Sequence, residues 1–550
     1  MRILSFTAGL THLYNQSILQ KALPEFTFVS LLGQELAHLR SLEIVRQLDL
    51  NIELHDNQWP KDEWWQPKPV ALFLSTAYPS PFRCRLFRAA LQHSIPVYAI
   101  EEVNQMANHM GESTHYFLPV DRLGVVSSFE ARCFSELGYR PEQLVYTGWP
   151  FFSTNKTVLA SDRETLLRSE LGVEAGERVA LLILGFLKER SIESFETLRV
   201  REQMLNFLSK GLPQGVRLVV KPHPAEDIRY VEKTVRHFAP GARVMESKIP
   251  IEDALSISDV VVSRGNSQVM FEAISRDLPL VIVPLGLRTL FDDVMPEVVA
   301  ETPEQLQRIC SDALIKLPDY KKVTDIHVPL SPEKSLAQTK HFFRSAQDPS
   351  SLLPQWSKRL DLTLQMHFVG MVEEAGRELE LLCEESEMPA EYQPVPVLLH
   401  FLFAMEAEVK HIEELLGIIG SHKIRRWHIQ ALWLRQLHRA LPSSALVRDG
   451  LHLVRGFNGE VNPHYFIHEL LLRIDLESAT GSDIEAEKLR AWFRRDYYFL
   501  PDFQDRELGQ LLRRGHINKE TLLLAGAWSY RQGRRITAGV WRRLKPSRVA

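Results

Sequence analysis

The segment Lys221-Pro222-His223-Pro224 follows an apolar, β-branched run at 216–220. Such a run indicates a buried strand, and open α/β sheets bind their ligands at the carboxyl ends of their strands. The two prolines fix the backbone angle φ on either side of His223, so a stiff loop presents the imidazole. The sequence therefore predicts a ligand site here. The alternative is a histidine that only caps the next helix.

A second polar segment, Ser263-Arg264-Gly265-Asn266-Ser267, follows the apolar run at 259–262. It precedes a predicted helix at 268–276, so free backbone N–H groups and hydroxyls are expected to point to one spot and bind an anion. Gly265 lets the backbone approach a ligand closely, and Glu272 can accept both hydroxyls of a ribose. The alternative is that Asn266 or Ser267 is a helix cap and Glu272 a surface acid.

Both segments belong to a region in which apolar runs alternate with amphipathic stretches of helix length. This alternation predicts parallel sheets that are covered by helices on both faces. The expected strands are 2–6, 27–29, 70–74, 96–100, 123–126 and 143–146 in a first series and 179–185, 216–220, 242–245, 259–263 and 279–284 in a second. The predicted fold class is therefore α/β, with two Rossmann-like parallel-sheet domains at 1–155 and 156–345.

From about residue 354 the strand pattern gives way to apolar residues three and four apart. This spacing predicts an all-α domain over 355–550, with helical stretches at 360–383, 394–417, 427–440 and 484–497. Turn signals between the stretches favour helix-pair repeats over a plain bundle. The tail at 531–550 is rich in arginine and lacks acids, so it is either a solvated terminus or a segment attracted to anionic lipid.

The composition is that of an ordinary soluble protein, with 45% hydrophobic and 24% charged residues among 550. A net charge of -4 does not favour binding to nucleic acid. The four cysteines have no metal-ligand spacing and are expected to be buried thiols in a reducing compartment. The first residues lack the length of a signal peptide, and no apolar stretch is long enough to span a membrane, so a cytoplasmic location is expected.

Taken together, the two polar segments and the later Asp277-Leu278-Pro279-Leu280-Val281 resemble the C-terminal half of glycosyltransferases of the GT-B fold. The likeness is to bacterial surface-polysaccharide enzymes with a His-Pro motif and a serine motif, which are the sialyltransferase-like and Kdo-transferase-like enzymes. It extends more distantly to glycerophosphotransferases and to the UDP-N-acetylglucosamine 2-epimerase. The resemblance covers about residues 2–330 and leaves out the helical third.

The resemblance implies a nucleotide site made of these two segments. His223 would hydrogen-bond the phosphate of the donor, Glu272 would hold the ribose, and Lys221 would either add charge at the leaving group or form an ion pair on the outer face of the sheet. Donors and helix dipoles would stabilise the leaving nucleotide, so neither a metal nor another cofactor is expected. The remaining members of the predicted site are Pro224, Ser263, Gly265, Asn266 and Ser267.

The base that deprotonates the acceptor is expected from the N-terminal half. Sialyltransferase-like enzymes carry two acids and a glycine at the end of a strand; here Glu101 and Glu102 follow such a strand, but Val103 replaces the glycine. Neighbouring carboxylates raise one another's pKa, as a base requires, whereas exposed loop glutamates are often only solvated. His12, in the first strand-to-helix turn, is the other candidate, with a plain turn histidine as the alternative.

The leading hypothesis is an inverting, metal-independent glycosyltransferase. It would move a sugar, preferably a CMP-activated nonulosonate or Kdo, to a surface glycan or a protein such as a flagellin or adhesin. A glycosyltransferase that uses a UDP-sugar and a nucleotide-sugar epimerase are the alternatives among enzymes. A non-catalytic scaffold that binds a partner through its helical region is the alternative outside them. The expected partners also include the inner membrane, through 531–550, and a second copy of the chain.

Overall fold

The computed structural model describes residues 1–403, apart from gaps of which the longest are 102–116, 152–160, 184–193 and 345–352. Beyond 403 it describes a helix at 483–496 and a few isolated positions. The chain forms two compact units, Met1–Ser153 with Thr324–Ala486 and Thr154–Val323 with Glu487–Ala550. The expected domain ranges 1–155, 156–345 and 355–550 stay a prediction.

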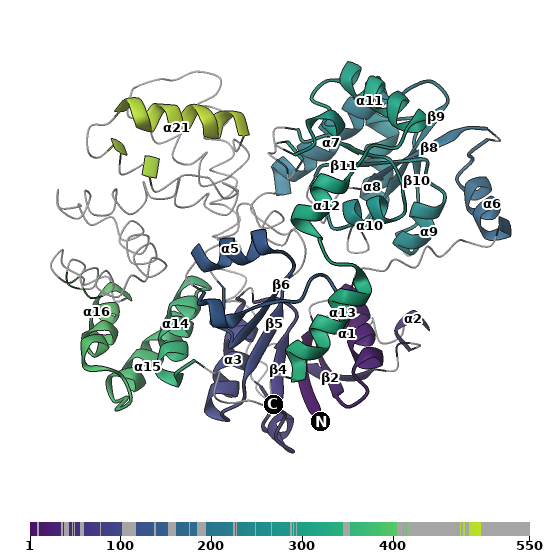
Figure 1. Ribbon diagram of the computed structural model, residues 1–550. Coiled ribbons are helices and arrows are strands. Elements are labelled where there is room, and N and C mark those ends of the chain that lie inside the picture. Colours follow the sequence, from purple (N-terminus) through teal and green to yellow (C-terminus); the bar gives the residue numbers. More distant parts are fainter. Residues whose placement is uncertain are drawn as a thin grey trace. The chain divides into compact units, whose positions relative to one another are not determined.

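The first unit is built on a seven-stranded parallel sheet with the order β3-β2-β1-β4-β5-β6-β7 (Figure 1). Most strands are largely apolar and, after their first residue, buried, which is typical of a parallel sheet with helices on both faces. The strands are β1 (Arg2–Thr7), β2 (Thr27–Gly33), β3 (Asn51–His55), β4 (Ala71–Leu74), β5 (Val97–Ile100), β6 (Arg122–Val125) and β7 (Leu144–Tyr146). Strand β3 was not predicted; it is a partly exposed edge strand without an apolar run.

Successive residues of these strands face opposite sides, so two cores form. On one side α1 (Leu10–Ala22) and α13 (Pro332–Arg344) cover Ile3 and Phe73, with Phe342 and Phe343 of α13 in the core. On the other side α3 (Pro81–Gln92), α5 (Ser128–Glu136) and α14 (Gln355–Phe368) cover the sheet. Helix α13 approaches closely at Gly148, where a Cβ would lie 2.3 Å from Oγ of Ser335.

The first helices of the helical region are anchored on this first sheet. Nζ of Lys358 in α14 lies 2.7 Å from Oδ1 of Asp121, and both side chains are buried. Helix α15 (Val372–Cys383) is tied to α3 by the ion pair between Arg85 and Glu374, at 2.7 Å. The predicted single stretch 360–383 is interrupted, because the chain turns at Gly370 with φ +84° between α14 and α15.

Helix α16 (Pro394–Phe403) follows α15, and α21 (Asp483–Asp496) matches the last predicted helical stretch. Most of the region 355–550 in which helix-pair repeats are predicted, including the stretch 427–440 and the basic tail 531–550, lies outside the described residues. No helix among the described residues is long and apolar enough to cross a membrane. Cys84 and Cys310 are buried as expected, but Cys383 is exposed at the end of α15.

The second unit is built on a five-stranded parallel sheet with the order β10-β9-β8-β11-β12 (Figure 1). Its strands are β8 (Arg178–Ile183), β9 (Val216–Lys221), β10 (Arg243–Val244), β11 (Val260–Ser263) and β12 (Leu280–Ile282). The helices are α6 (Ser161–Glu170), α7 (Ser194–Gly211), α8 (Ile228–Phe238), α9 (Ile251–Ser256), α10 (Val269–Ser275) and α11 (Pro303–Ile315), and α12 (Lys321–His327) begins in this unit and ends in the first. The prediction of two parallel α/β sheets is therefore confirmed.

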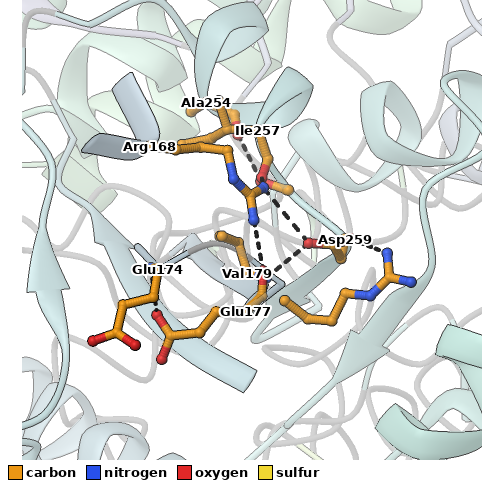
Figure 2. A network of polar contacts seen from close by, with 9 residues as sticks. Arg168, Glu174, Glu177, Val179, Ala254, Ile257 and Asp259 are labelled. Atoms are coloured by element: carbon orange, nitrogen blue, oxygen red, sulfur yellow. Dashed lines mark hydrogen bonds and ion pairs between the residues drawn. The ribbon is translucent and has the colours of Figure 1, made fainter. Parts of the chain in front are cut away.

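A polar network joins α6 to the amino ends of β8 and β11 (Figure 2). The guanidinium of Arg168 donates to the carbonyl oxygens of Ile257, at 3.0 Å, and of Glu177, at 2.6 Å. The carboxylate of Asp259 accepts the N–H of Val179 at 2.8 Å. This network stabilises the edge of the second sheet opposite to the predicted ligand site.

Candidate functional site

The two polar segments that the sequence predicts lie at one edge of the second sheet. Ile183, the last residue of β8, pairs with Lys221 of β9 on one side and with Ser263 of β11 on the other. Neighbouring strands are about 4.8 Å apart, so the backbones of Lys221 and Ser263 are about 10 Å apart. The strand order also reverses between β8 and β11, which is where open α/β sheets bind ligands.

Lys221 is buried, and its ammonium donates to two backbone carbonyls. These are the oxygens of Ser247, at 2.8 Å, and of Pro222, at 3.2 Å. Lys221 thus ties the loop after β9 to the segment after β10, and among the described residues it forms no ion pair on the outer face of the sheet. Burial lowers the pKa of Lys221 to about 8, and the charge of Glu226 opposes this effect. The ammonium is mostly protonated at neutral pH.

His223 is half-buried in the loop after β9. Its backbone N–H donates to Oε2 of Glu226 at 2.9 Å. Burial, and then the nearby charge of Lys221, lower the pKa of the imidazole to about 4. The ring is therefore neutral at pH 7 and carries one N–H, with which it can donate a hydrogen bond. Pro224 lies outside the described residues.

The loop after β11 is shaped by Gly265, whose φ is +93°. A Cβ at this position would lie 2.4 Å from Cγ2 of Thr289, so both the backbone angle and the space require glycine. Oγ of Ser263 accepts the N–H of Gly265 at 3.3 Å, and Oγ of Ser267 accepts the N–H of Val269 at 3.4 Å. Ser267 therefore also supports the start of α10. Asn266 lies outside the described residues.

Glu272 lies on α10, a helix of only seven residues, and its side chain is half-buried. Burial raises the pKa of its carboxyl to about 7; Glu252 adds to the effect and Arg276 opposes it. The group is thus partly protonated at neutral pH. Its ionised form can accept two hydroxyl protons, as a ribose would offer.

The predicted bases belong to the carboxyl edge of the first sheet. Glu101 follows β5 and is fully buried: its Oε1 accepts the N–H of Ala77 at 2.7 Å, so it is no solvated loop acid. His12 is half-buried on α1, the helix that follows β1. Strand β4 separates β1 from β5 in this sheet. Glu102 lies outside the described residues.

The structure adds a buried acid that the sequence did not single out, Glu130 in the first turn of α5. Its Oε2 accepts the N–H of Val126 at 2.7 Å, and its own N–H donates to Oγ of Ser127 at 3.1 Å. Burial raises the pKa of Glu130 to about 7. The spacing of Ser127 and Glu130 is that of a capping box, and this signal was available in the sequence.

No family model and no curated protein matches the chain, but several solved structures are similar to it. A UDP-GlcNAc 2-epimerase from Neisseria meningitidis bound to UDP-GlcNAc is 13% identical, with a TM-score of 0.44 over 62% of this chain and 100% of that one. A glycosyltransferase from Rickettsia africae is 9% identical, with a TM-score of 0.43 over 63% and 99%. The wall teichoic acid polymerase TagF is 12% identical, with a TM-score of 0.40 over 64% and 90%. At identities and TM-scores this low, the activities of these proteins do not carry over to this chain.

Proposed function

We propose that this chain is a glycosyltransferase that uses a nucleotide sugar as its donor. The observation that supports the proposal most is the register of the second sheet, in which Ile183 pairs with both Lys221 and Ser263. This pairing brings the start of the Lys-Pro-His-Pro loop, 221–224, and the start of the serine loop, 263–267, to the point where the strand order reverses, where a nucleotide phosphate is commonly bound. The first unit would then serve the acceptor.

The groups at this edge of the sheet can donate hydrogen bonds and positive charge to the phosphate of a leaving nucleotide. In the proposed role, the neutral imidazole of His223 donates one hydrogen bond to a phosphate oxygen, and the buried ammonium of Lys221 adds positive charge nearby. Gly265 lets backbone N–H groups approach the same oxygen, since it carries no side chain. Donors that are held in place before the reaction stabilise the negative charge that forms as the sugar leaves. Neither a metal nor another cofactor is part of the proposed site.

The reaction itself would be a single displacement. A base of the first unit, Glu102, Glu101 or His12, takes the proton of the acceptor hydroxyl, whose oxygen attacks the anomeric carbon. The bond between that carbon and the phosphate oxygen breaks, and the nucleotide leaves with inversion at the sugar. The motifs favour a CMP-activated nonulosonate or Kdo as donor, with a UDP-sugar as the alternative and a glycan or protein as acceptor.

A thermal-shift panel with CMP, CDP, UDP and GDP tests this proposal. A nucleotide that binds only the folded chain stabilises it by about 2.7 kcal/mol at a hundredfold excess over Kd. We expect one nucleotide to raise the melting temperature of the parent and of His237→Ala, which alters an exposed histidine on α8. In His223→Ala the rise should largely disappear. An equal rise in both variants would place the nucleotide elsewhere.

A further inference from the structure

The loop that presents His223 is closed by one residue, Glu226. Oε2 of Glu226 accepts the backbone N–H of His223 at 2.9 Å. The backbone N–H of Glu226 in turn donates to the carbonyl oxygen of His223, also at 2.9 Å. Both polar groups of the His223 backbone are therefore held by Glu226. The direction of the imidazole depends on where this carboxylate lies.

Glu226 is itself held by a buried cation. Its Oε1 forms an ion pair with Nη2 of Arg201 in α7, and both side chains are almost completely buried, at 2% and 3% exposure. The guanidinium of Arg201 also lies over the ring of Tyr230, at 5.5 Å from its centroid. Within the described residues, Nε and Nη1 of Arg201 have no hydrogen-bond partner. A buried guanidinium with so few partners depends on the carboxylate of Glu226 for its charge balance.

We infer that Arg201 and Glu226 are positioning residues that set the direction of His223 and thereby the affinity for the nucleotide phosphate. The inference rests on the proposed function, because it assigns the ion pair a role at the proposed phosphate site. It extends that site from the loop after β9 to α7, a helix that neither polar segment includes. Arg201 and Glu226 act through His223, so neither needs to touch the nucleotide.

Four variants separate positioning from simple stabilisation. Glu226→Ala removes both the charge and the acceptor of the His223 N–H, whereas Glu226→Gln keeps an oxygen that can accept it. Arg201→Met removes the cation at similar volume, and Arg201→Met with Glu226→Gln leaves no unpaired buried charge. Arg217→Met is the matched control, since it breaks the ion pair with Glu177 at 2.7 Å in the same unit but far along β9 from His223.

Two measurements on the full chain test whether Arg201 and Glu226 position His223. The first is the Kd for UDP and for CMP; the second, which needs no nucleotide, is the pH titration of the His223 ring by NMR. We expect Glu226→Ala and Arg201→Met to weaken binding about tenfold or more, which corresponds to about 1.4 kcal/mol. We also expect the His223 pKa to rise from about 4 toward its ordinary value in both, because burial is the largest cause of its lowering and a ring that turns out of its buried position loses that effect. In Glu226→Ala the loss of the carboxylate alone would lower the pKa, so a rise there reports the changed position of the ring. The double variant should recover most of the binding and the low pKa.

A purely structural role would give a different pattern. The melting temperature would fall in the single variants, while the Kd and the His223 titration stayed as in the parent and in Arg217→Met. That pattern would overturn the inference. If the parent binds neither UDP nor CMP, the proposed donors are wrong, yet the titration of His223 still tells whether the ion pair orients it.

Discussion

Replacing Gly265 by alanine is expected to disturb the candidate site at its most crowded point. The added Cβ would lie 2.4 Å from Cγ2 and 2.8 Å from Cβ of Thr289, which is 5% exposed and has little room to move. The backbone at Gly265 also has φ +93°, which an alanine rarely adopts. Two separate costs therefore add at this position.

Gly215→Ala separates these costs. Gly215 belongs to the same unit, has φ +79°, and a Cβ there would meet nothing within 4 Å. This variant should show only the backbone cost, about 1–2 kcal/mol. Overpacking in a tight place adds about 1–3 kcal/mol, so Gly265→Ala should cost about 2–5 kcal/mol. For a unit of this size, the additional cost corresponds to a melting temperature about 2–12 °C lower than in Gly215→Ala.

Differential scanning calorimetry of the parent and both variants measures this difference. A third variant, Gly265→Ala with Thr289→Ser, removes Cγ2 but keeps Oγ1, which accepts the N–H of Phe291 at 3.2 Å. We expect this variant to regain part of the lost stability. Equal melting temperatures for the two glycine variants would refute the close contact between Gly265 and Thr289, and with it the described shape of the serine loop.

Three further predictions concern charged side chains. Affinity for UDP should rise about fivefold between about pH 6 and pH 7, because the carboxyl of Glu272 has a pKa of about 7 and its ionised form accepts the ribose hydroxyls, whereas Lys221, with a pKa of about 8, keeps most of its charge over this range. Calorimetric titration should show that Glu272→Gln loses this rise, and a rise that persists in the variant would exclude the ribose role. Lys358→Met leaves the buried carboxylate of Asp121 without its ion pair and should lower the free energy of unfolding in urea by about 3–5 kcal/mol. Adding Asp121→Asn to the same chain should recover most of this loss, and no recovery would contradict the described pair. Arg168→Met should cost about 1–3 kcal/mol in urea unfolding and leave the Kd for UDP unchanged; a weaker Kd would contradict its remote position.

The strands of the second sheet could be predicted because buried strands have continuous apolar runs in the sequence. Runs such as 216–220 and 259–263 are short and rich in β-branched residues, which favours a buried strand over a helix, and the polar residues after them mark the carboxyl edge. Strand β3 was not predicted, because a partly exposed strand at the edge of a sheet does not need an apolar run. The break between α14 and α15 depends on a positive φ at Gly370, which the apolar spacing of the helices does not reveal.

The candidate site was predictable only where its residues lie at the carboxyl end of a strand or just after it. Ser263 is the last residue of β11 and His223 comes two residues after the end of β9, and the register places Lys221 and Ser263 on either side of Ile183. Arg201 lies on α7, and its ion pair with Glu226 arises from packing between helix and loop, which no local pattern encodes. Burial is likewise a tertiary property, so the raised pKa of Glu130 and the lowered pKa of His223 could not be deduced from the residue order.

The central claim is that a nucleotide binds at the carboxyl edge of the second sheet. Amide hydrogen exchange, measured with and without nucleotide, tests this claim most directly. With UDP, or with whichever of the four nucleotides stabilises the chain most, amide exchange should slow at His223 and in the loop that contains Gly265 and Ser267. It should stay unchanged around Asp259, at the amino ends of the strands. Slower exchange around Asp259 with no change at His223 and Gly265 would contradict the account.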